Sequence, residues 1–235
     1  MTPLFVAAER GHRGLVSLLL ARAATPHSRN WNGLTPLGVA ALAGRLGVVQ
    51  ELLQAGAEIQ TRDNSGNTII MNVISESEAG PGVVAALLRA GADPDRPNTA
   101  GMFPLLAAAE LAGERGEQLA RTLLQHGARP DIRALAAAAK TGNTGVAAAL
   151  LQAGVEAKAD TTGQGEDSLF PLGLATAGGH TGVARLLLEA GHTRCGPGRP
   201  APLHGCIELA VASRQSQLIA LIGSYSEKLA LKDEL

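Results

Sequence analysis

Aromatic residues are scarce in this chain. Its 235 residues include one tryptophan, one tyrosine and three phenylalanines, about 2% of the total. Aromatic side chains bury the largest apolar areas and usually dominate a globular core. Without them, a core has to be built from leucine, valine and alanine in close contact. The composition therefore favours closely packed helices.

Cysteine, net charge and long apolar runs are also scarce. Two cysteines in a chain of this length predict no disulfide framework. The net charge is −1 with acids and bases interspersed, so no strong field attracts nucleic acid. No apolar run approaches the roughly 18 residues that a membrane span needs. We therefore expect a soluble, intracellular protein, placed in the cytoplasm, that binds neither nucleic acid nor membrane.

What the chain does contain is a repeated unit, which is clearest between Gly33 and Asp63. Thr35 and Pro36 predict a helix start, because the threonine oxygen accepts from a free amide and proline gives up a donor that has no partner there. Gly44 predicts the end of this helix through a left-handed cap. A second apolar run stops at Gly56. Neither short helix can bury its apolar face alone, so the unit requires neighbours of its own kind.

The same features recur every 33 residues. The recurring positions are Thr2, Thr35 and Thr68; Gly11 and Gly44; Leu20 and Leu53. The T-P-L opening, the A-A pair, the G-[HR] break and the LL-x-x-G-A close resemble the ankyrin repeat. This resemblance covers nearly the whole chain, and it implies an all-α solenoid with short hairpin fingers that binds other proteins. A tetratricopeptide array has a similar period but lacks the proline start and the Gly-Ala close.

The resemblance predicts one solenoid domain over residues 1–235, made of about seven helix-turn-helix units. The approximate repeats are 1–29, 30–62, 63–97, 98–130, 131–159, 160–195 and 196–235, the last being a C-terminal cap. The fifth repeat is about six residues short, so its finger should be missing. The histidine that links repeats in this family is also replaced throughout. Cohesion should then depend on apolar packing, with the weakest joint near residues 128–135.

In the ankyrin family, the fingertips and the exposed face of the first helices form a concave surface that contacts partner proteins. Trp31, the only tryptophan, falls at a fingertip, where it either anchors a partner or folds back onto the first helix pair. The predicted protein-binding residues are Trp31, Leu34, Leu42, Asn64, Asn67, Glu76, Thr99, Met102, Glu110 and Lys140.

Four residues near the C-terminus form a candidate metal set. His192, Cys195, His204 and Cys206 follow the order H-x2-C-x8-H-x-C, and zinc binds imidazole and thiolate together. The spacing fits no standard zinc finger closely. In the alternative interpretation, His192 closes a helix pair and Cys206 is a small core residue. We favour this alternative and expect no cofactor.

No pattern of catalytic residues emerges from the sequence. It contains no phosphate-binding G-x-x-x-x-G-K-[ST] motif and no nucleophile in a strand-turn-helix context. The leading hypothesis is a monomeric, non-catalytic interaction module or scaffold that binds another protein or peptide. The alternative is the substrate-recruiting region of a larger enzyme or signalling protein. The chain ends in Lys232 to Leu235 (KDEL), which reads as an endoplasmic-reticulum retrieval signal. Such a signal works only in a protein that also has a secretory signal sequence. Residues 13–23 loosely resemble one, but they fit the second helix of the first repeat better.

Overall fold

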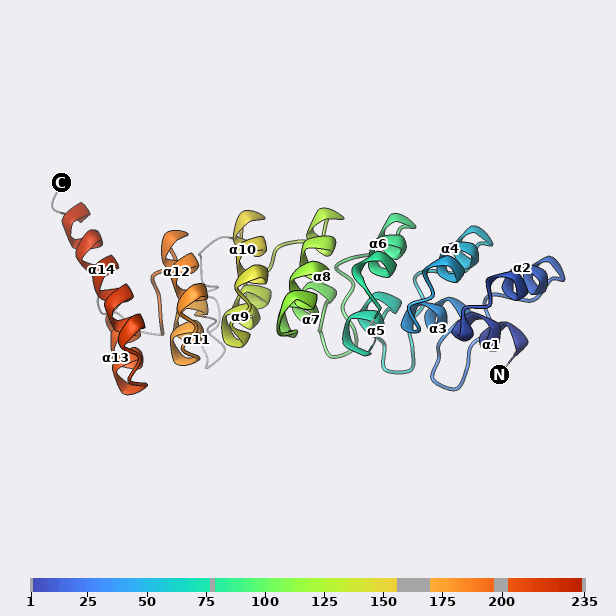
Figure 1. Cartoon of the computed structure of the whole chain (residues 1–235), viewed down its shortest axis with the longest axis horizontal. Coiled ribbons are helices and arrows are strands. Elements are labelled where there is room, and N and C mark those ends of the chain that lie inside the picture. The colour runs from blue at the N-terminus through green and yellow to red at the C-terminus, as the bar shows by residue number, and fades with distance from the viewer. Residues whose placement is uncertain (1, 77–78, 156–169, 197–202, 234–235) are drawn as a thin grey trace. The chain divides into compact units, whose positions relative to one another are not determined.

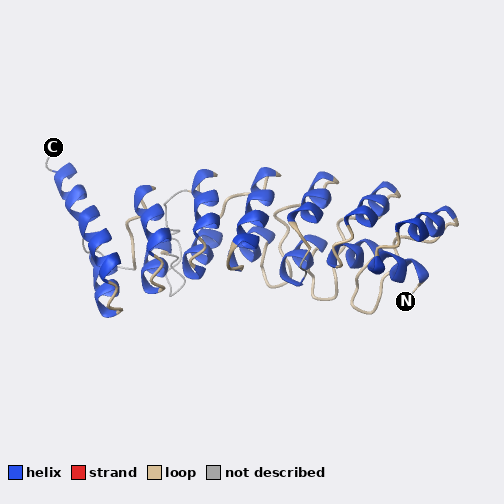
Figure 2. Cartoon of the chain, viewed as in Figure 1, coloured by secondary structure: helices blue, strands red, loops and turns tan. Residues whose placement is uncertain are grey.

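The computed structural model describes residues 2–76, 79–155, 170–196 and 203–233 (Figure 1). This part of the chain contains fourteen α-helices and no strand (Figure 2). Its one extended pairing is an isolated bridge between Arg62 and Thr68. The prediction of an all-α repeat fold is therefore confirmed. None of the helices within these ranges is both long and apolar enough to cross a membrane.

The chain divides into two compact units. The first unit comprises residues 1–108 and 118–129, and the second comprises residues 109–117 and 130–235. Helices α7 (Pro104–Glu110) and α8 (Glu114–Gln125) therefore contribute residues to both.

The first unit is a row of short helix pairs. Its remaining helices are α1 (Pro3–Arg10), α2 (Arg13–Ala21), α3 (Pro36–Leu42), α4 (Leu46–Gln54), α5 (Ile69–Glu76) and α6 (Pro81–Arg89). The first helices of successive pairs pack in the order α1, α3, α5 (Figure 1). The second helices pack in the order α2, α4, α6. Each pair thus buries its apolar faces against the next.

Local signals start and end these helices as the sequence predicts. Thr35 Oγ1 accepts a hydrogen bond from the backbone N–H of Gly38 at 3.2 Å, and Thr68 Oγ1 accepts from that of Met71 at 3.3 Å. Gly44, just after α3, has a φ of +69°, which glycine adopts without steric cost. The helix ends are therefore fixed within each repeat.

The core of the first unit consists of small and branched apolar side chains. Leu37, Val49 and Leu52 are fully buried, and so are both members of the alanine pair, Ala40 and Ala41. Alanine at these positions lets neighbouring helices approach closely. Each buried leucine or valine contributes about 1.5–3 kcal/mol. The core predicted from the composition is confirmed.

The second unit repeats this arrangement. Its helices are α9 (Ile132–Thr141), α10 (Thr144–Gln152), α11 (Pro171–Ala177), α12 (Thr181–Glu189), α13 (His204–Ala212) and α14 (Ser216–Asp233). Helix α11 packs between α9 and α13, and α12 packs between α10 and α14. Asn143 accepts from the N–H of Val146 at the start of α10 and donates to the carbonyls of Leu111 and Gly113, each at 3.0 Å. This buried asparagine therefore joins α10 to the segment before α8.

The connection from α8 to α9 is too short to form a finger. It spans residues 126–131, whereas residues 55–68 connect α4 to α5. Asp131 ends the connection and caps α9 by accepting from the N–H of Arg133 at 2.7 Å. The expected loss of the finger before the fifth repeat is confirmed.

Candidate protein-binding surface

Three hairpin fingers in the first unit share one turn. Each finger opens with an asparagine or aspartate whose side-chain oxygen accepts from the backbone N–H groups two and four residues later, at 2.8–3.0 Å. The three fingers are residues 30–34, 63–67 and 98–102, which open with Asn30, Asp63 and Asn98. Such side-chain bonds hold a turn without help from a sheet. The fingers are thus built from their own residues.

Glycine lets each finger rest directly on the next. Gly33 and Gly66 have φ values of +78° and +77°. A Cβ atom on Gly33 would lie 2.6 Å from Asn64 Oδ1, and one on Gly66 would lie 2.5 Å from Thr99 Cγ2. No real Cβ tolerates such contacts, so the close approach of neighbouring fingers requires glycine at both positions.

A ladder of arginines ties the fingers together. Arg29 donates to the carbonyl of Arg62 at 2.8 Å, and Arg62 donates to the carbonyl of Pro97 at 2.8 Å. Arg96 donates in the opposite direction, to the carbonyl of Gln60 at 3.2 Å. These bonds span 33 to 36 residues, so each one joins successive repeats. A surface held this way loses little conformational freedom when a partner binds.

Trp31 stands at the tip of the first finger and is 82% exposed. Its backbone carbonyl accepts a hydrogen bond from Asn64 Nδ2 at 2.6 Å, which fixes the backbone beneath the indole. Trp31 therefore does not fold back onto the first helix pair, and its role as an anchor for a partner stays a prediction. The indole therefore presents a large apolar surface to solvent from a backbone that is held in place.

Other predicted contact residues help to build the finger row. Asn98 donates to Asn67 Oδ1 at 2.8 Å, and Thr99 Oγ1 donates to the carbonyl of Ser65 at 2.7 Å. Asn64, Asn67 and Thr99 therefore link fingers to one another, a role that the sequence analysis did not assign to them. Leu34, Leu42 and Met102 are half-buried beside the row. The first unit brings these seven predicted residues, including Trp31, onto the fingers and α3.

The remaining predicted contact residues lie elsewhere. Glu110 and Lys140 belong to the second unit, where both are exposed at the ends of α7 and α9. The carbonyl of Lys140 accepts from His180 Nε2 at 3.1 Å. Glu76 is the last residue of α5, and its side chain lies outside the described part of the structure.

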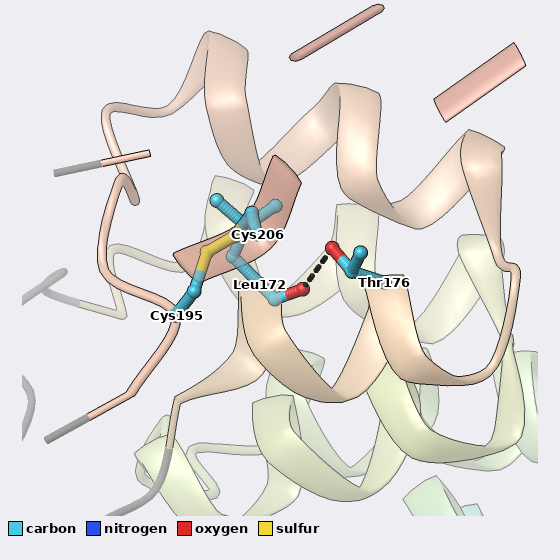
Figure 3. The surroundings of a disulfide bond; sticks show 4 residues. All are labelled: Leu172, Thr176, Cys195 and Cys206. Atoms are coloured by element: carbon cyan, nitrogen blue, oxygen red, sulfur yellow. Dashed lines mark hydrogen bonds between the residues drawn. A yellow bond between two sulfur atoms is a disulfide. The ribbon is translucent and has the colours of Figure 1, made fainter. Parts of the chain in front are cut away.

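The four candidate metal ligands do not assemble. Cys195 and Cys206 form a disulfide with their Cα atoms 5.4 Å apart (Figure 3), so neither sulfur is a thiolate. His192 is buried, while His204 is exposed beside Glu208 at 3.1 Å. Within the described ranges, no three His, Cys, Asp or Glu side chains converge on a metal-sized site. The disulfide itself was not predicted from the sequence, whereas Cys206 is a buried core residue, as the favoured interpretation expected.

The disulfide ties the loop after α12 to the interface of α11 and α13. Cys206 is fully buried on α13, and Leu172 and Thr176 of α11 lie beside it (Figure 3). A Cβ on Gly173 would lie 2.3 Å from the carbonyl oxygen of Cys195, so the loop crosses α11 where a side chain is missing. The sequence signal was the glycine- and proline-rich stretch between the two cysteines. Their proximity depends on helix packing that the spacing alone does not reveal.

Comparison with known proteins identifies the repeat. A family model described as "Ankyrin repeats (3 copies)" matches residues 1–63. Residues 1–63 thus match ankyrin repeats. The chain as a whole is similar in structure to the human ASB11 ankyrin repeat domain, with a TM-score of 0.70 and 21% sequence identity, over 94% of this chain and 97% of that one. An identity this low shows the shared fold only. No curated protein sequence matches the chain.

Ankyrin repeats generally bind other proteins, and their fold is typically non-catalytic. Several backbone N–H and carbonyl groups of the finger row are already paired within the row. A partner would therefore be recognised mainly by the exposed side chains.

Proposed function

We propose that the protein is a monomeric, non-catalytic module that binds a partner protein or peptide along the fingers and the exposed helix ends of its first unit. The observation that carries this proposal is the exposed Trp31 on a finger row held by the arginine ladder. Tryptophan is among the commonest binding hot spots, and a rigid support lowers the entropic cost of using it.

The proposed surface suits a mixed apolar and polar partner segment. Leu34 and Leu42 are half-buried and add apolar area near the first and second repeats. Glu9 and Arg10, at the end of α1, are exposed and carry opposite charges. Such a surface selects partners by shape and by individual side chains, because no single charge dominates it. Glu110 and Lys140 provide exposed contact positions in the second unit.

The test compares partner capture by the full chain and three variants. Trp31→Ala and Leu42→Glu alter the proposed surface, whereas Val211→Ala changes an exposed apolar residue on α13 of the second unit. The partner recovered with the wild type should be depleted at least about tenfold with Trp31→Ala and retained with Val211→Ala. Calorimetry with the purified partner should then show a loss of about 2 kcal/mol for Trp31→Ala. Equal binding by Trp31→Ala and the wild type would refute the assignment.

A further inference from the structure

The disulfide of the second unit stands at a position from which earlier repeats form hydrogen bonds to the next repeat. This position lies four residues after a left-handed glycine that ends a helix pair, and the glycines concerned are Gly56, Gly91 and Gly191. Gln60 Nε2 donates to the carbonyl of Gly91 at 2.9 Å, and Asp95 Oδ1 accepts from the N–H of Arg129 at 2.9 Å. At Cys195 the link to the next repeat is the covalent bond to Cys206. This link can therefore be broken by thiols.

Cys206 occupies the position of a buried proline. It lies eight residues before Arg214, just as Pro171 lies eight residues before Gly179. Arg214 and Gly179 both have a left-handed backbone after their helix, with φ values of +55° and +75°. Pro171 and Cys206 are both buried. A reduced cysteine packs as a small apolar residue, so opening the disulfide places no charged or strongly polar group in this interface.

Two glycines make room for Cys195. A Cβ on Gly173 of α11 would meet the carbonyl oxygen of Cys195 and would lie 3.3 Å from its Cα. A Cβ on Gly205 of α13 would lie 3.9 Å from Cys195 Cβ. Gly38 is the equivalent of Gly173 in the second repeat, and the nearest atom to its added Cβ is Leu34 Cδ2 at 3.5 Å. The backbone of Cys195 therefore lies directly on α11, where its sulfur reaches Cys206 (Figure 3).

The two cysteines differ in their access to solvent. Cys206 is fully buried, whereas Cys195 is partly exposed in the segment after α12. Thiol–disulfide exchange begins when a thiolate attacks an accessible sulfur, so attack is directed to Cys195. The bond closes a ring with a sequence separation of 11, and a short ring gains less from chain entropy than a long one. Partial exposure and a short ring both favour reduction.

We infer that Cys195–Cys206 is a reversible thiol–disulfide exchange site. A thiolate attacks Cys195 Sγ and forms a mixed disulfide, while Cys206 Sγ leaves as a thiolate and takes up a proton. A second thiol of the reductant then attacks the reductant sulfur of the mixed disulfide, and Cys195 leaves in the same way. Two reductant thiols are thereby oxidised to one disulfide, and both cysteines are reduced.

The two redox states differ in the segment around Cys195. The oxidised protein holds residues 193–196 against α11. The reduced protein releases them and opens the first turn of α11 at Gly173 to solvent, while α13 stays packed on α11 through the buried Cys206. This site is separate from the finger row and does not depend on the function proposed there.

The test equilibrates the full-length chain with mixtures of reduced and oxidised dithiothreitol, without denaturant. Samples are quenched and alkylated with N-ethylmaleimide in denaturant, and mass spectrometry counts the labels. Oxidised dithiothreitol should leave no free thiol and the reduced form should leave two, in both directions of the titration. When the reduced protein is alkylated without denaturant, Cys195 should react at least about tenfold faster than Cys206, because only Cys195 is accessible.

Two matched glycine variants test the contact with α11. Gly173→Ala crowds Cys195 in the oxidised state only, so half-reduction should need at least about tenfold less reduced dithiothreitol relative to the oxidised form. Gly38→Ala changes the equivalent glycine of the second repeat and should leave this ratio unchanged.

Limited trypsin digestion reports the release of the segment. Arg194 is exposed next to Cys195, so Cys195→Ser should be cleaved after Arg194 at least about tenfold faster than the oxidised wild type. Cleavage after Arg22 in the first unit should be the same in both proteins. If Cys195→Ser loses helical circular dichroism, Cys206→Ala takes its place, because alanine suits the small buried site.

Three results would overturn the inference. The first is two free thiols that persist in oxidised dithiothreitol, because the bond would then not form. The second is a disulfide that excess reduced dithiothreitol opens only in denaturant, because the bond would then be a fixed structural crosslink. The third is equal cleavage after Arg194 in the oxidised wild type and in the cysteine variant, because the bond would then not hold the segment.

Discussion

Gly33 and Gly38, five residues apart in the second repeat, differ in whether a side chain fits at their positions. Gly33 has a φ of +78°, and its added Cβ would lie 2.9 Å from the backbone nitrogen of Asn64. Gly38 lies in the first turn of α3, where the nearest atom to an added Cβ is Leu34 Cδ2 at an ordinary 3.5 Å. Sequence alone shows two glycines, and only the backbone angle and the neighbours separate them.

Alanine substitution should therefore change stability in opposite directions at these two sites. Gly33→Ala should lower the free energy of unfolding by about 1–3 kcal/mol, because the left-handed backbone is strained and the next finger has to move. Gly38→Ala should raise it by up to about 1 kcal/mol through higher helix propensity. Urea denaturation followed by circular dichroism measures both. A stabilising effect at Gly33 would show that the fingers do not pack as described.

His192 is a buried titratable group in the second unit, and burial lowers the pKa of this residue below its ordinary value of 6.5. Ala57, Ala92 and Ala128 occupy the equivalent position in earlier repeats. The unfolded chain therefore takes up a proton near pH 6.5 that the folded chain resists. Stability from neutral His192 is fully present above that pH and is lost as the pH falls toward the lowered pKa.

His192→Ala should remove this contribution to the pH dependence while leaving the fold intact. Urea unfolding of the wild type should show lower stability at about pH 5 than at about pH 7.5. The difference should be smaller in the variant, whose alanine matches Ala57, Ala92 and Ala128. An identical pH profile for the two proteins would indicate that His192 is protonated equally in the folded and unfolded states.

At the scale of helices and fingers, the sequence predicted what depends on short-range chemistry. The start of α3 at Thr35-Pro36 and the left-handed Gly44 follow from residues a few positions apart. The loss of the finger before α9 follows from counting residues. These features need no knowledge of distant contacts.

Features that join distant residues were missed or left open. The arginine ladder needs Arg29 and Arg62 to lie side by side, which the 33-residue spacing permits but does not demonstrate. The exposure of Trp31 depends on how its finger packs, so both interpretations fitted the sequence. The pairing of Cys195 and Cys206 depends on the contact of α11 with α13. Each case is decided by tertiary packing.

At the scale of the whole chain, the division into two compact units crosses the chain within α7, within α8, and between Arg129 and Pro130. The last of these crossings lies in the connection from α8 to α9. This is the connection that lacks a finger. In the first unit, side-chain turns and arginine bonds reinforce each connection between repeats, whereas residues 126–131 are too few to form such a hairpin. Stability in repeat arrays is approximately a sum over repeats and their interfaces, so a weak connection can separate the array into parts.

Core substitutions should then act mainly within their own unit. Leu37 in the first unit and Leu187 in the second are both fully buried, and changing either to alanine should cost about 2–5 kcal/mol. Hydrogen exchange followed by mass spectrometry should show that Leu37→Ala lowers protection in residues 2–76 and that Leu187→Ala lowers it in residues 171–196. In the wild type, residues 128–135 should exchange sooner than the finger amides at 30–34 and 63–67. Parallel loss of protection in both units with either variant would mean that the array unfolds as one cooperative block, because stability would then be shared across the connection that lacks a finger.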